Sequence, residues 1–171
     1  MKIKIVVTDA CIFIDLYELG LMALFFNMDM EIHTTTAVLL HELFSEQQQI
    51  LQAYQSVGRL IVHNLQGQDF IEIYSEQYPK SLSETDKSVL HIANKLNACV
   101  LSSDKTLRNY AKNKKIEYHG MLWIFDKMVE NVILSKKEAA EKLRQLVAIN
   151  VTFRNNQLLI DEIEKRLKSW N

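Results

Sequence analysis

The sequence contains little cysteine and little proline, and it has no excess of charge of either sign. Its 171 residues include two cysteines, Cys11 and Cys99, and one proline, Pro79. Both cysteines lie in apolar segments without the spacing of metal ligands, which is typical of buried thiols in a reducing compartment. We therefore expect a cytoplasmic protein.

Long hydrophobic runs, internal repeats and low-complexity tracts are also missing. The apolar run of residues 5–7 is soon interrupted by Asp9, and residues 21–26 fall far short of the roughly 20 apolar residues that span a membrane. The formal net charge is −1, so any contact with nucleic acid must depend on local basic patches. These absences predict no membrane association and count against a protein that only binds nucleic acid.

What the sequence does contain is 48% hydrophobic residues, arranged as strands that alternate with helices. Short apolar runs predict strands that end at Thr8 and that cover residues 30–34, 60–63, 99–101 and 116–118. Patterned segments between them predict helices over residues 10–26, 36–44, 47–56, 69–77, 83–97, 105–114 and 121–132. This alternation indicates an α/β fold with a parallel sheet and helices on both faces.

The chain after residue 134 is predicted to be helical throughout. Ser135 and Glu138 form the pattern of a capping box. Leu159, Ile163, Leu167 and Trp170 form an apolar stripe at helical spacing, which must be buried. We therefore divide the chain into a main domain, residues 1–134, and a helical extension, residues 135–171, that packs on the same domain.

The first strand carries the strongest indication of a functional site. Lys2 and Lys4 alternate with apolar residues only at its outer edge, and a continuous apolar run then leads into Asp9. Such a run is typical of a central parallel strand that is covered on both faces. Asp9 would therefore lie at the carboxyl end of the sheet, where ligands bind in open α/β folds.

Three further acids have unusual positions. Asp86 falls on the apolar stripe of its predicted helix, and Glu42 shares a helix face with Val38 and Leu39. Asp104 follows the fourth strand as Asp9 follows the first. Carboxylates gathered at one pocket repel one another unless a hard divalent cation such as Mg²⁺ or Mn²⁺ binds between them.

Each aspartate also has a structural interpretation. Asp9 and Asp104 fit the first position of a helix cap, and Asp86 fits a capping box opened by Ser83. Taken together, the acids fit metal-assisted hydrolysis of phosphodiester bonds, which needs no histidine or cysteine nucleophile.

Four segments resemble the PIN domain family, and within it the toxin-like ribonucleases. The segments are VVTDACIFIDL, TAVLLHELF, LSETDKSVLHIA and VLSSDKTLRNYA, in this order. The resemblance implies a three-layer α/β/α fold with a five-stranded parallel sheet in the order 3-2-1-4-5. It also implies an endoribonuclease that depends on Mg²⁺ or Mn²⁺.

The resemblance also assigns the site residues. Asp9, Glu42 and Asp86 would bind the metal, Asp104 would complete the site, and Ser102 would support the ligands. Cys11 departs from the family, which commonly has a small polar residue there. An antitoxin-like protein partner and a homodimer are further expectations. The alternatives are a PIN-fold interaction module without activity and a structure-specific DNA nuclease.

The other polar residues are weaker candidates. Lys105, Arg108 and Lys112 share a helix face near Asp104 and would contact RNA phosphates, although such a run is more often only a solvated face. Asp15 is predicted to be structural or solvated, and Asp126 to lie on the surface. The five histidines form no recognisable metal-binding motif, so we predict core or surface roles for them.

Overall fold

A computed structural model describes residues 3–171, so Lys2 lies outside the described residues. The chain folds into two compact units. The first, which we call the sheet unit, contains residues 3–14 and Asp29–Gly120. The second, which we call the helical unit, contains Asp15–Met28 and Met121–Asn171.

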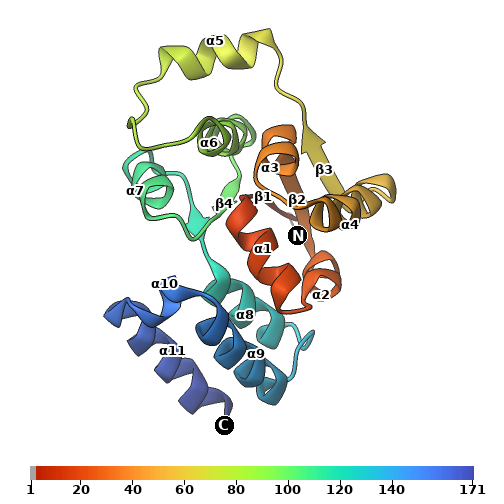
Figure 1. The fold of residues 1–171 in the computed structure, drawn as a ribbon, viewed down its shortest axis with the longest axis vertical. Helices are drawn as coiled ribbons and strands as arrows, with labels where there is room; N and C mark the ends of the chain where they lie inside the picture. The colour runs from red at the N-terminus through yellow and green to blue at the C-terminus, as the bar shows by residue number, and fades with distance from the viewer. Residues whose placement is uncertain (1–2) are drawn as a thin grey trace. The chain divides into compact units, whose positions relative to one another are not determined.

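The sheet unit is built on five parallel strands in the order β3-β2-β1-β4-β5 (Figure 1). The strands are β1 (Lys4–Thr8), β2 (Met30–Thr35), β3 (Leu60–His63), β4 (Cys99–Leu101) and β5 (Tyr118–His119). Three consecutive residues of the central strand, Val6, Val7 and Thr8, are fully buried, as expected for a strand covered on both faces. The predicted α/β class and strand order are confirmed.

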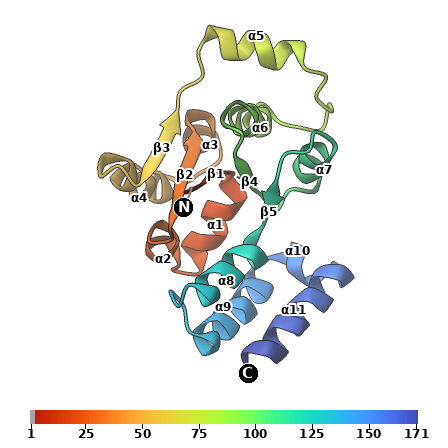
Figure 2. The same ribbon diagram turned by 180° about the vertical axis from the view of Figure 1, so that it is seen from behind.

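Five helices lie entirely within the sheet unit. They are α3 (Thr36–His41), α4 (Ser45–Ser56), α5 (Gly67–Ser75), α6 (Glu84–Leu96) and α7 (Lys105–Asn113). Helix α6 packs against β1, β2 and β4, and helices α5 and α7 pack against α6 (Figure 2). The side chains of Thr35, Ser83 and Asp104 accept backbone N–H bonds at the starts of α3, α6 and α7, as the sequence predicts.

The helical unit consists of α2 (Met22–Phe26), α8 (Met121–Glu130), α9 (Lys136–Ile149), α10 (Val151–Arg154) and α11 (Gln157–Trp170). The predicted capping box at Ser135 and Glu138 opens α9. Ile163 and Trp170 of the apolar stripe are buried, α11 packs on α9, and the Trp170 ring lies 6.4 Å from that of Phe125 in α8. Leu159 and Leu167 are half-buried, so the stripe is covered only in part within the helical unit.

Several predicted element boundaries are wrong, two of them for a clear local reason. The helix expected over residues 10–26 is two helices, α1 (Ala10–Glu18) and α2, because Gly20 has a φ of 66° and ends the first one. The fifth strand covers residues 118–119 instead of 116–118, because Lys115 adopts a φ of 58° in the turn that precedes it.

Within residues 3–171, no helix is both long and apolar enough to cross a membrane.

Candidate active site

Asp9 occupies the carboxyl end of the central strand, and its side chain is only 3% exposed. Its Oδ1 accepts a hydrogen bond from the backbone N–H of Ala10 at 2.8 Å. Its Oδ2 accepts one from the Ser102 hydroxyl at 2.8 Å, and the Cys11 thiol lies 3.4 Å from the same oxygen. The carboxylate is thus fixed by neutral donors alone.

Parallel pairing of β1 with β4 brings Ser102 to Asp9. Thr8 pairs with Leu101, and the Asp9 N–H bonds the Leu101 carbonyl at 3.0 Å, so the residues after both strands are neighbours. The Ser102 hydroxyl also accepts a bond from the Asp104 N–H at 3.1 Å. Ser102 therefore links Asp9 to the backbone that leads into α7.

Asp86 lies in the first turn of α6 and forms the capping box that its spacing predicts. Its Oδ2 accepts from the Ser83 N–H at 2.9 Å, while its own N–H bonds the Ser83 hydroxyl at 3.0 Å. This structural role does not separate Asp86 from the other acids, because its charge also raises the pKa values of Asp9 and Glu42. The Asp86 carboxylate therefore caps α6 and also adds negative charge to the site.

Glu42 corrects the sequence prediction in one respect. We expected it on the inward face of a helix that reaches Phe44, but α3 ends at His41 and Glu42 is an exposed residue directly after the helix. A hydrogen bond from the Thr85 side chain nevertheless holds Glu42 beside the start of α6. Thr85, a buried residue that the sequence analysis did not select, is therefore part of the site.

The electrostatics of Asp9, Glu42 and Asp86 are those of crowded like charges; we call these three residues the acidic group. Burial raises the pKa of Asp9, and the charge of Asp86 raises it further. Glu42 is exposed, yet partial desolvation of its carboxylate raises its pKa, with added contributions from Asp9 and then Asp86 and opposing ones from Thr85 and His41. Among residues 3–171, no lysine or arginine forms an ion pair with these three acids.

Asp104 is placed differently from the other three acids. It is exposed, and its Oδ1 accepts from the Leu107 N–H at 2.7 Å, which makes it the N-cap of α7. The structural interpretation of Asp104 is thus confirmed. The Asp104 N–H bonds the Ser102 hydroxyl, and this hydroxyl in turn bonds the Asp9 carboxylate.

The ligand atoms of the acidic group are carboxylate oxygens, which hard divalent cations prefer, but among the described residues they do not all lie within 4.8 Å of one another, so a cation would have to draw them together. Two buried hydroxyls beside the site, Thr8 Oγ1 and Ser103 Oγ, also have no hydrogen-bond partner within the described chain. An uncompensated negative charge with spare oxygen atoms nearby is chemically suited to binding a metal ion.

The predicted basic face lies on α7, next to Asp104. Lys105 and Lys112 are exposed. Arg108 is half-buried, and its guanidinium carbon lies 5.2 Å from the centre of the Tyr118 ring, so part of its role is to pack on β5.

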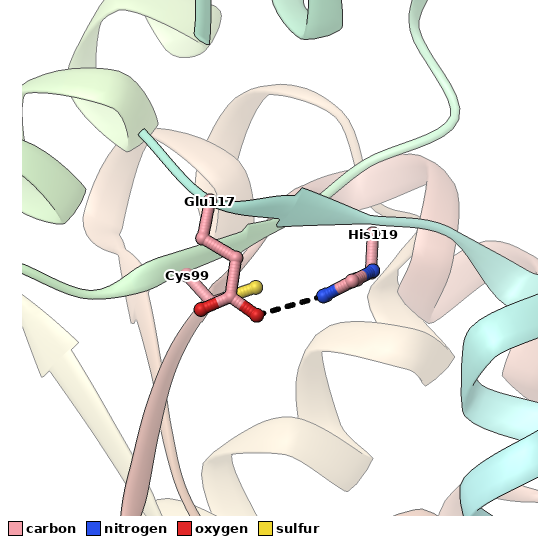
Figure 3. Close-up of side chains that lie close together, drawn as sticks. All are labelled: Cys99, Glu117 and His119. Atoms are coloured by element: carbon pink, nitrogen blue, oxygen red, sulfur yellow. Dashed lines mark hydrogen bonds and ion pairs between the residues drawn. The ribbon is translucent and has the colours of Figure 1, made fainter. Parts of the chain in front are cut away.

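Two further groups offer metal-ligand atoms that lie within 4.8 Å of one another, and neither contains the predicted acids. One is Cys99, Glu117 and His119 at the sheet edge (Figure 3), and the other is Asp69, Glu72 and His91 between α5 and α6. Sequence analysis missed both groups and treated their histidines as isolated. No local motif reveals them, since each group joins two residues that are close in sequence to a third residue at least 18 positions away, Cys99 in one group and His91 in the other.

Comparisons with known proteins show which family this chain belongs to. A family model described as PIN domain matches residues 5–169. Among solved structures, the chain is similar to a domain of a functionally unknown protein from Methanocaldococcus jannaschii DSM 2661, with 22% identity over 69% of this chain and 91% of that chain and a TM-score of 0.45. No curated protein matches. PIN domains are generally nucleases, and the match includes the helices after residue 134. The chain therefore belongs to the PIN domain family.

Proposed function

We propose that this protein is an endoribonuclease that hydrolyses RNA phosphodiester bonds with the help of Mg²⁺ or Mn²⁺. The observation that carries the proposal is the acidic group. Asp9 follows β1, Glu42 follows α3 and Asp86 lies in α6. The charge of Asp86 raises the pKa values of Asp9 and Glu42, and no lysine or arginine in residues 3–171 forms an ion pair with the three acids. Uncompensated acids cost stability, so their convergence favours a function that uses the charge.

Each residue of the site would have its own role. Asp9, Glu42 and Asp86 would hold the cation, and the Asp104 carboxylate would complete the site at its edge. Ser102 would keep the Asp9 carboxylate in one orientation through its 2.8 Å hydrogen bond. A bound Mg²⁺ or Mn²⁺ would supply Lewis-acid stabilisation of phosphate charge and would lower the pKa of an attacking water.

The substrate would be positioned by positive charge on α7. Lys105 and Lys112 are exposed and follow Asp104 on the same helix, which suits contacts with phosphates of a single strand. Such contacts carry no sequence information, so they would set affinity and salt dependence rather than the cleavage site.

The proposal is tested by incubating the purified protein with single-stranded RNA in Mn²⁺ or Mg²⁺ and in chelator. Unfolding and refolding during purification would remove a bound inhibitor such as an antitoxin-like protein. We expect cleavage only with metal, and a loss of at least about 100-fold in Asp9→Asn. Ser45→Ala, at an exposed position in α4, is the matched control.

Three results would contradict the proposal. If folded Asp9→Asn and Asp86→Asn cleave RNA as fast as wild type, the activity arises elsewhere. If wild type binds metal but leaves both RNA and branched DNA intact, the protein is a non-catalytic interaction module. Cleavage of the DNA alone would identify a structure-specific DNA nuclease.

A further inference from the structure

The edge of the sheet carries a second set of metal-ligand side chains that the proposed nuclease activity does not use. Pairing of Val100 with Tyr118 places Cys99 beside Glu117, and Glu117 and His119 are two residues apart, so they point to the same side of β5. Figure 3 shows the Cys99 sulfur, the Glu117 carboxylate and the His119 ring gathered there. These three residues, which we call the sheet-edge cluster, bring together sulfur, oxygen and nitrogen.

The hydrogen bonds of the sheet-edge cluster leave two ligand atoms available. His119 Nε2 bonds Glu117 Oε1 at 2.8 Å, and the Lys4 ammonium pairs with the same oxygen. Neither of these bonds uses Glu117 Oε2. The Cys99 thiol makes one weak contact, 3.5 Å from the Val100 carbonyl. Cys99 is 3% exposed, whereas the side chain of Glu117 is 52% exposed, so an ion could enter from the glutamate side.

The distances suit a small tetrahedral ion after modest adjustment. Zinc bonds of 2.0–2.3 Å to nitrogen, oxygen and sulfur imply ligand-to-ligand separations of roughly 3.3–3.8 Å. In the sheet-edge cluster these atoms lie within 4.8 Å of one another, so side-chain shifts of about 1 Å would close the set. Cys99 lies in β4, and Glu117 and His119 lie beside and in β5. The pairing of these two strands holds the three backbone positions in place.

We propose that Cys99, Glu117 and His119 form a binding site for a borderline-soft divalent metal of the zinc class, with a fourth position open to solvent. The choice of metal follows from the donors. Thiolate and imidazole favour Zn²⁺ or Co²⁺ over Mg²⁺, whereas the all-oxygen acidic group favours Mg²⁺ or Mn²⁺. The sheet unit would therefore hold two sites that bind different metal ions.

Lys4 is the competing cation at this site. Its ion pair with Glu117 must open when a metal binds, and the 38% exposure of its side chain allows it to turn into solvent. Removal of Lys4 should therefore raise the metal affinity, whereas removal of a ligand should lower it. Lys4→Met should increase metal affinity by about threefold or more, because a weak exposed ion pair no longer has to be broken.

The test is a Co²⁺ titration of the full-length protein with Mg²⁺ in excess, so that the acidic group is saturated. We expect near-ultraviolet absorption from a thiolate–cobalt bond that Zn²⁺ abolishes by displacement. Burial raises the pKa of Cys99 to about 12, so the free thiol is protonated at neutral pH and gives no such background. Cys99→Ser should remove the absorption.

Three variants make the result independent of folding defects. Glu117→Gln and His119→Gln alter exposed or half-buried side chains, and each should lower Co²⁺ affinity by at least about 100-fold. Cys11→Ser removes the other thiol and should leave the absorption intact. Asp9→Asn should also leave it intact, which separates this site from the proposed nuclease site.

The proposal is overturned if wild type shows no thiolate absorption with Co²⁺. It is equally overturned if the absorption persists in folded Cys99→Ser or disappears in Cys11→Ser. Unchanged affinity in both Glu117→Gln and His119→Gln would show that the cluster is only an ion-pair network with Lys4. None of these outcomes bears on whether the acidic group cleaves RNA.

Discussion

Two acids of the helical unit, Asp126 and Asp15, accept hydrogen bonds from a side chain far along the chain, whereas no lysine or arginine among residues 3–171 forms an ion pair with the acidic group of the sheet unit. Asp126, which we expected at the surface, is half-buried and accepts two bonds from Arg166 at 2.8 and 2.7 Å. Asp15 is buried and accepts from the Asn150 side chain at 3.0 Å.

This difference teaches how to separate structural carboxylates from functional ones. An acid with a charged donor, such as Asp126 with Arg166, stabilises the fold it belongs to, whereas the neutral donor of Asp15 leaves its pKa raised. Buried acids that face other acids raise one another's pKa values and reduce stability until a cation binds. The predictions below test whether the contrast between the two units is real.

The largest effect should come from adding metal to the acidic group. At a Mn²⁺ concentration about 100 times its dissociation constant, binding to the folded state alone adds about 2.7 kcal/mol to the free energy of unfolding. Wild type should therefore melt several degrees higher with Mn²⁺, as measured by calorimetry, and Asp9→Asn should gain little. Equal gains in both proteins would place the metal elsewhere.

The next effect should come from breaking the pair in the helical unit. Arg166→Ala leaves the half-buried Asp126 without its two charged donors, which should lower the free energy of unfolding by about 1–2 kcal/mol. Urea denaturation measures the change. Lys165→Ala, which removes an exposed pair with Glu162, is the matched control and should behave as wild type. A similar loss in both variants would mean that Asp126 needs no partner.

A smaller effect of opposite sign should appear at Asp86 without metal. Asp86→Asn keeps an oxygen for the Ser83 N–H but removes a charge, so it should raise the free energy of unfolding by about 0.5–1 kcal/mol in chelator. Ser83→Ala removes only the cap and should lower it by about 1 kcal/mol. If both variants lose stability alike, Asp86 is only a capping residue.

The smallest effect should be a pH dependence that arises from Asp15. Burial raises the pKa of Asp15 to about 6, from an ordinary value of 3.8. The folded state therefore binds this proton more tightly than the unfolded state, so the contribution is favourable below about pH 4 and is lost as the pH rises through about 6. Asp15→Asn retains an acceptor for Asn150 and should flatten the dependence of the melting temperature on pH over this window, with a gain of about 1–2 °C at pH 7. If the melting temperature of Asp15→Asn depends on pH as in wild type, ionisation of Asp15 does not lower the stability of the folded state.

The sequence allowed more of the fold to be predicted than of the site. The runs that give β3 and β4 were identified to the residue, and so were the caps at Ser83, Asp104 and Ser135, because each depends on neighbours within four positions. The break at Gly20 was missed because an apolar helical pattern continues on both sides of it.

Helix phase was the weak point at Glu42. Its spacing from Val38 and Leu39 predicted an inward face, but α3 ends one residue before it, and helix ends are the least certain feature of a sequence pattern. Asp86 shows a second limit. Capping and metal-binding interpretations were treated as alternatives, whereas the structure gives Asp86 a cap and a place in the acidic group together.

The sequence by itself determined the alternation of strands and helices, most of the helix caps and the burial of the central strand, because these depend on local spacing and on hydrophobic periodicity. Only the tertiary structure decided which charges meet. Arg166 reaches Asp126 across 40 positions, and parallel register brings Cys99 to Glu117 and Ser102 to Asp9. Such pairings depend on strand order and register, which no short segment of the chain specifies.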